Sequence, residues 1–183
     1  MELVKNLQNQ KLLKNLIIVI LGTLLLTLSA KIKIPFYPVP MTMQTFVVLL
    51  IGISFSYKIA VSIVGLYLIE GILGLPVFSN SPEKGIGLVY FTGPTMGYLI
   101  GFLFASYLAG YFNYNKNYLL NFFKLLLSVS FIYLFGILWL GNLIGWEKPV
   151  FELGAKPFLL AELFKVLILT FLAKKLSVLR KFI

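Results

Sequence analysis

Long apolar runs that contain almost no charged side chains fill most of this chain. The runs cover residues 12–30, 41–55, 59–73, 94–112, 118–144 and 158–176. A helix of about 20 apolar residues crosses the hydrocarbon core of a bilayer, so each run is interpreted as one transmembrane helix. Of the 183 residues, 60% are hydrophobic and 12% are charged, about half the charged share of a soluble domain. The sequence therefore predicts an all-α integral membrane protein, with six transmembrane helices in a single domain over residues 1–183.

The first apolar run has an alternative interpretation as a secretory signal peptide. It follows Lys11 and Lys14 and ends at the small residues Ser29 and Ala30, which is also the outline of a cleaved leader. We favour a retained first helix, because the rest of the chain is itself a membrane protein.

The distribution of basic residues predicts the orientation in the membrane. An even number of spans places both termini on one side, and that side carries ten Lys and Arg residues. The opposite side carries five: Lys31, Lys33, Lys84, Lys148 and Lys156. The positive-inside rule then predicts cytoplasmic termini, in a multi-pass protein of the bacterial inner membrane. The segments 35–40, 74–93 and 145–157 would share the outer face.

The composition also excludes several classes of chemistry. The chain has no Cys, no His and no Asp, so the usual ligands of zinc and haem and the usual thiol nucleophile are absent. We expect no metal site and no cofactor. No phosphate-binding motif of the G-x-x-x-x-G-K-[ST] type occurs. The basic residues are scattered between apolar runs, which argues against nucleic acid as a partner.

Two charged residues inside the last apolar run are the strongest candidates for a functional site. Glu162 and Lys165 are three positions apart, so they share one face of a helix and can pair or point jointly at a polar ligand. The alternative is a lysine that extends to the membrane interface beside its glutamate partner.

Weaker candidates lie on other spans. The start of the fourth run offers free backbone amides beside Thr95, Gly97 and Tyr98, and such a helix start attracts a carboxylate. A helix-packing glycine and an interfacial tyrosine are the alternatives there. Gln44 and Tyr133 could hydrogen-bond a buried ligand, although either could equally be a structural residue.

Four sequence blocks, in order along the chain, resemble one known family. They are VPMTMQT at 39–45, GLPVF at 74–78, GPTMGYLIGF at 93–102 and PFLLAELFK at 157–165. They are similar to the signature blocks of BioY, the biotin-binding S-component of energy-coupling-factor (ECF) transporters, and the similarity runs from about residue 31 to residue 176. The resemblance implies the six-helix S-component fold and capture of biotin, the transported ligand, at the outer face. It also implies a membrane coupling subunit and two cytoplasmic ATPase subunits as partners.

The resemblance implies roles for particular residues. Lys165 would serve the ligand while Glu162 orients it or accepts an N–H group. The remaining residues expected to contact the ligand are Gln44, Gly85, Thr95, Gly97, Tyr98 and Tyr133.

The sequence departs from the family pattern in three respects. Met96 stands where a glycine is usual, and it could narrow the pocket. Glu162 replaces an aspartate. Thr23 and Thr27 occupy the face of the first span where S-components carry small alanines for docking on the coupling subunit.

Two other functions compete with a biotin-binding subunit that has no catalytic activity. One is an S-component of the same fold for another vitamin. The other is a small membrane enzyme that acts on lipid, with Glu162, Lys165 and Tyr98 as its catalytic residues.

Overall fold

The computed structural model describes residues 2–182, with side chains from 10 to 181. Met1 and Ile183, the ends of the predicted domain, lie outside the described residues. The helices are α1 (Glu2–Lys31), α2 (Gln44–Ser54), α3 (Tyr57–Ile72), α4 (Met96–Tyr111), α5 (Tyr118–Ile144), α6 (Val150–Gly154) and α7 (Leu159–Ser177). Short 3-10 turns occur at η1 (Gly87–Thr92), η2 (Lys156–Phe158) and η3 (Val178–Phe182). Two short strands, β1 (Lys33–Ile34) and β2 (Met41–Thr42), pair antiparallel.

Each predicted span coincides with one helix, and α6 is an additional helix inside the predicted loop 145–157. Two helical segments, Gln10–Lys31 and Tyr118–Ile144, are by themselves long and apolar enough to cross a membrane, and α2 and α4 are shorter apolar helices. Helix α5 begins and ends where the sequence requires it. The side chain of Asn117 accepts a hydrogen bond from the Leu120 N–H at 3.0 Å, and Gly145 follows the helix with a φ of 93°.

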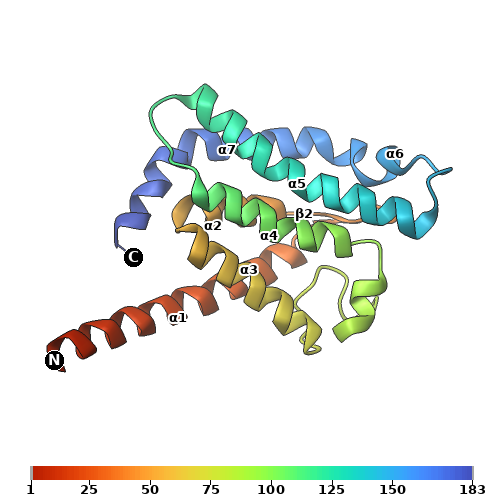
Figure 1. Ribbon diagram of the computed structural model, residues 1–183. Coiled ribbons are helices and arrows are strands. Elements are labelled where there is room, and N and C mark those ends of the chain that lie inside the picture. Colours follow the sequence, from red (N-terminus) through yellow and green to blue (C-terminus); the bar gives the residue numbers. More distant parts are fainter. Residues whose placement is uncertain (1, 183) are drawn as a thin grey trace.

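The helices run between two distinct ends of the molecule (Figure 1). Both chain termini lie at one end, which we call the terminal end. The segments 32–43, 73–95 and 145–158 lie at the other, which we call the loop end. The start of α1 extends away from the other helices beyond the terminal end.

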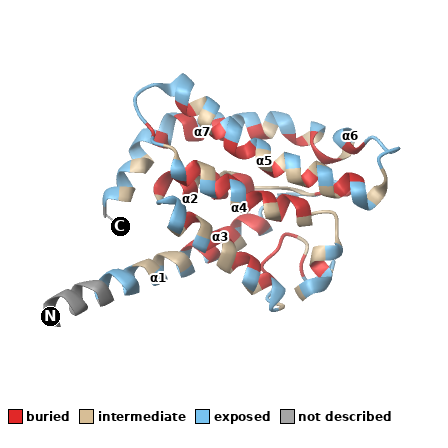
Figure 2. Cartoon of the chain, viewed as in Figure 1, coloured by how far each residue is buried: buried red, intermediate tan, exposed pale blue. Residues whose placement is uncertain are grey.

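Buried residues line the faces that the helices turn toward one another, and exposed residues cover the outside (Figure 2). Many outward residues are large and apolar, including Leu12, Leu28 and Phe171, each more than 60% exposed. In water such a surface would be an aggregation hazard, whereas in a bilayer it contacts acyl chains at no cost. The exposure pattern therefore agrees with the composition.

Arg180 joins two helices at the terminal end. Its guanidinium donates to the carbonyls of Gly52 and Ile53 in α2 and of Ala109 and Phe112 at the end of α4, at 2.7–2.9 Å. These carbonyls belong to helix C-termini, where unpaired acceptors and the helix dipole favour a cation. Burial raises the pKa of the neighbouring Tyr114 despite the opposing charge of Arg180. Its hydroxyl therefore stays protonated and donates to the Ala109 carbonyl at 3.0 Å.

Candidate functional site

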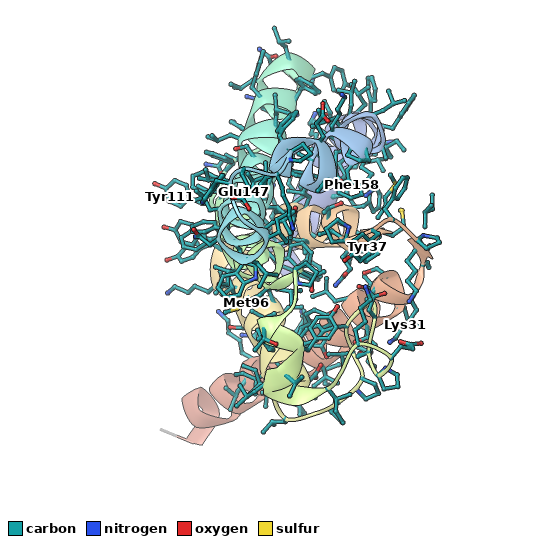
Figure 3. All side chains as sticks on the ribbon, turned by 90° about the vertical axis from the view of Figure 1, so that its right-hand side faces the viewer. Lys31, Tyr37, Met96, Tyr111, Glu147 and Phe158 are labelled. Carbon is teal, nitrogen blue, oxygen red and sulfur yellow. The ribbon has the colours of Figure 1, made fainter. Side chains whose placement is uncertain are left out.

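A cavity of about 550 Å³, including the part open to solvent, lies at the loop end. Its walls come from the starts of α2, α4 and α7, from the middle of α5 and from the loops above them. The lining residues are Val39, Pro40, Met41, Thr42, Gln44, Thr45, Phe78, Ser79, Tyr90, Thr95, Tyr98, Leu99, Phe102, Ile132, Tyr133, Phe158 and Glu162. In the view onto the loop end, Phe158, Tyr37 and Met96 lie around the start of α2 (Figure 3).

The Glu162–Lys165 pair lies inside the bundle and is fully engaged with α2. The Nζ atom of Lys165 donates to Glu162 Oε1 at 2.6 Å, to the Thr42 carbonyl at 2.7 Å and to Thr45 Oγ1 at 2.9 Å. An ammonium group has three donors, so these three acceptors use all of them. Lys165 is 7% exposed and is not a lining residue of the cavity. It therefore holds Glu162 and the start of α2 in place, and direct contact of its ammonium with the ligand stays a prediction.

Glu162 presents an open acceptor to the cavity. Its Oε1 atom also accepts from Thr45 Oγ1 at 2.7 Å, while its Oε2 atom is buried and has no hydrogen-bond partner among the described residues. The residue is 6% exposed and lines the cavity. Tyr133 is close enough to this carboxylate for an electrostatic and a side-chain hydrogen-bonding interaction, although no hydrogen bond of good geometry reaches Oε2. A buried carboxylate oxygen without a partner is costly, so it is a site where a ligand N–H group would bind.

Gln44 and Thr45 provide the polar wall on α2. The Gln44 amide donates to the Tyr67 hydroxyl at 2.7 Å, and that hydroxyl donates to the Val77 carbonyl at 3.1 Å. This connection fixes the loop after α3 against the start of α2. The sequence analysis did not single out Thr45 or Thr42 as site residues, because their partners on α7 are 117–123 residues away in the chain.

The start of α4 contributes Thr95 and Tyr98 to the cavity. The Thr95 side chain makes no capping hydrogen bond to the helix, so its hydroxyl is available to a ligand. The Tyr98 hydroxyl instead donates to the Gly154 carbonyl at 2.8 Å and is buried. That bond corrects the expectation of a free phenol donor, although the ring still forms part of the wall.

Gly85, Gly97 and Met96 do not line the cavity. A Cβ atom at Gly97 would overlap the carbonyl of Phe135, so this glycine permits the close approach of α4 to α5. Gly85 has a φ of 99° and serves the turn before η1. Direct ligand contact by Gly85 and Gly97 stays a prediction, as does narrowing of the pocket by Met96.

Two lysines hold the loop above the cavity. Lys31 Nζ donates to the carbonyls of Phe78 and Ser81, both at 2.8 Å. Lys33 Nζ donates to the Ser79 carbonyl at 2.8 Å. Since Phe78 and Ser79 line the cavity, these bonds connect the segment after α1 to the cavity roof.

A second, apolar groove lies between α5 and α7 and encloses about 850 Å³, including its open part. Tyr133 and Glu162 line both this groove and the cavity. These two side chains therefore separate the cavity from the groove.

Thr23 does not lie on a free face of α1. It is 2% exposed, and its hydroxyl donates to Glu70 Oε1 on α3 at 3.0 Å. In this structure Thr23 contacts α3, and its docking on a partner stays a prediction. The hydroxyl of Thr27 donates to the Thr23 carbonyl at 2.9 Å and its side chain is half-buried, so a role for Thr27 stays a prediction.

Comparison with known proteins identifies the family. The family model described as the BioY family matches residues 4–182. This chain belongs to the BioY family. Among BioY proteins, it is 34% identical over 164 residues to a probable biotin transporter of Pyrococcus horikoshii, covering 90% of this chain and 96% of that one. It is 32% identical over 159 residues to a biotin transporter of Thermotoga maritima, covering 85% of this chain and 90% of that one.

A solved structure has the same fold. It is the crystal structure of an S-component for biotin from an ECF-type ABC transporter, with a TM-score of 0.76 and 26% identity over 92% of each chain. The fold of this BioY protein is therefore that of an ECF S-component.

Proposed function

We propose that this BioY protein is the biotin-binding subunit of an ECF-type uptake transporter and has no catalytic activity of its own. The observation that carries the proposal is the buried Oε2 atom of Glu162, an acceptor without a partner at the wall of the loop-end cavity. Lys165 and Thr45 hold the other oxygen of the same carboxylate, so the acceptor is fixed in position before a ligand arrives. The family relationship argues against a lipid-acting enzyme.

Biotin has the groups that such a cavity requires. Its ureido ring carries two N–H donors and one carbonyl, its thiophane ring is apolar, and its valerate chain ends in a carboxylate. One ureido N–H would donate to Glu162 Oε2, while Phe78, Tyr90 and Phe102 would cover the apolar ring. The Thr95 hydroxyl and the amides at the start of α4 would meet either the ureido oxygen or the carboxylate.

The transport step requires proteins that this chain does not contain. We propose that the helices α1 to α5 and α7 span the inner membrane as one domain, with the termini in the cytoplasm and the loop end outside. Ligand captured at the loop end would be released to the cytoplasm with a coupling subunit and two ATPase subunits. Thr27 on α1 remains a proposed contact for that coupling subunit, and lipid covers the remaining outer surface.

Isothermal titration of the purified protein with biotin tests the binding function. We expect one tight site per chain and no competition from riboflavin, thiamin or niacin at concentrations that saturate their own binding proteins. The proposal would be refuted if the folded protein gave no heat of binding with biotin, or if it bound another vitamin more tightly.

A further inference from the structure

The ring of Tyr98 lies in a narrow slot between two glycines from different helices. A Cβ atom at Gly136 in α5 would overlap the ring, and a Cβ atom at Gly154 in α6 would lie 2.6 Å from the hydroxyl oxygen. No side chain larger than hydrogen fits at either position without moving Tyr98. Neither glycine has the positive φ that disfavours other residues. Space around the tyrosine, rather than backbone conformation, therefore requires glycine at both positions.

Hydrogen bonding and ring packing fix the same side chain. Its hydroxyl donates to the Gly154 carbonyl at 2.8 Å. Its ring meets Tyr133 edge to face, with centroids 6.2 Å apart and planes at 90°. Tyr133 in turn interacts electrostatically with Glu162. A continuous set of contacts therefore leads from α6 through two tyrosines to the carboxylate in the cavity.

The remaining direction open to Tyr98 is the cavity. The α5 backbone at Gly136 closes one side of the ring, Gly154 closes its hydroxyl end, and Tyr133 covers another side, while the ring itself lines the cavity. Any atom added to the slot would push the ring into the space of the ligand or against Tyr133.

We propose that Gly136 and Gly154 form a slot that sets the width of the cavity, and that Tyr98 is a positioning residue connecting α6 to the ligand. This inference rests on the proposed binding of biotin. It assigns a specificity role to α6, a helix of five residues, because its Gly154 both limits and hydrogen-bonds the tyrosine.

The test compares Gly154→Ala with Gly154→Ala/Tyr98→Phe, using isothermal titration with biotin and with desthiobiotin, which lacks the sulfur bridge and is slimmer. Overpacking commonly costs enough to weaken binding about tenfold or more, and we expect Gly154→Ala to raise the biotin Kd by roughly that factor. Desthiobiotin should lose less affinity. In the double variant the hydroxyl, the atom nearest the new methyl group, is gone, and of the contacts below 3 Å only Leu140 Cδ2, the end of a flexible side chain, remains. The biotin affinity should then return to that of Tyr98→Phe alone.

Gly65→Ala is the matched control, because Gly65 also lies in a helix and a Cβ atom there meets nothing within 4 Å. It should bind both ligands as the unmodified protein does. Tyr98→Phe alone retains the ring and loses the bond to Gly154, and it provides a folded variant if Gly154→Ala does not fold. We expect its biotin Kd to rise about threefold, because the ring is no longer tied to Gly154 and only part of the worth of that bond is felt at the ligand.

The outcomes separate the two hypotheses. If the unmodified protein binds no biotin, the proposed function fails. If it binds biotin and Gly154→Ala binds it equally well, the slot hypothesis is overturned. Equal losses for biotin and desthiobiotin, or no recovery in the double variant, would also overturn it, because a merely structural defect would affect both ligands alike. If Gly154→Ala does not fold, unchanged binding by Tyr98→Phe would overturn it.

Discussion

Neutralising the carboxylate at the cavity wall should weaken biotin binding without removing the shape of the site. In Glu162→Gln the amide retains the volume of the side chain, and Lys165 keeps its bonds to the Thr42 carbonyl and Thr45 Oγ1. The group that replaces the Oε2 atom at the cavity wall then carries no charge. A hydrogen bond to a charged group contributes about 1.5–3 kcal/mol, which corresponds to a Kd raised by about 10-fold to 150-fold.

The double variant Glu162→Gln/Lys165→Met separates affinity from stability. Each single substitution leaves one buried charge without its partner, which typically costs about 3–5 kcal/mol. Both residues are more than 90% buried, and their charged atoms are 2.6 Å apart. Removing both charges is often close to neutral for stability. The double variant should therefore regain most of the thermal stability lost in the single variants, while its affinity for biotin stays low.

Isothermal titration of the detergent-solubilised protein gives the Kd for biotin, and thermal unfolding in the same detergent gives the stability. Glu70→Gln is the control, since Glu70 is also a carboxylate within a long helix but does not line the cavity. The reasoning would be wrong if Glu162→Gln bound biotin within about threefold of the unmodified protein. It would also be wrong if the double variant regained affinity together with stability.

Three further substitutions test the packing that supports the site. Arg180→Ala should lower the free energy of unfolding by about 2–5 kcal/mol because four helix carbonyls lose their donor. Arg180→Lys should recover part of the lost stability in thermal melts. An unchanged melting temperature for Arg180→Ala would contradict this role. Gly97→Ala should melt well below the unmodified protein, since its methyl group overlaps the Phe135 carbonyl; normal stability would mean that α4 and α5 lie farther apart. Thr23→Val should lower the free energy of unfolding by about 1 kcal/mol, because Glu70 loses its hydroxyl donor. Thr27→Val is the control, since the Thr27 hydroxyl bonds within its own helix. An equal loss of stability in Thr27→Val would argue against the Thr23–Glu70 interaction.

The long helices could be predicted closely because local sequence signals mark their ends. Asn117 and Gly145 bound α5, and the prolines of the segment 35–40 separate α1 from α2. Helix α6 could not be predicted, because five residues between loop segments carry too little periodicity to be distinguished from a turn.

The site could be predicted in part. The spacing of Glu162 and Lys165 placed both side chains on one helix face, where they could pair or point jointly at a ligand, and the structure has them paired at 2.6 Å. Thr42 and Thr45 decide which of the two side chains faces the cavity, and no local pattern reveals contacts with residues so distant in the chain. The spacing of small residues on α1 likewise does not say which neighbour they meet. The side chain of Thr23 meets Glu70 on α3.

The polar cluster explains why a lysine that does not reach the cavity would still be needed for binding. Lys165 and Thr45 donate to Oε1 and hold the carboxylate in position, while Oε2 has no hydrogen-bond partner among the described residues. A ligand N–H group at this position would give Oε2 a partner, which favours a ligand with a donor there over an apolar molecule of the same shape.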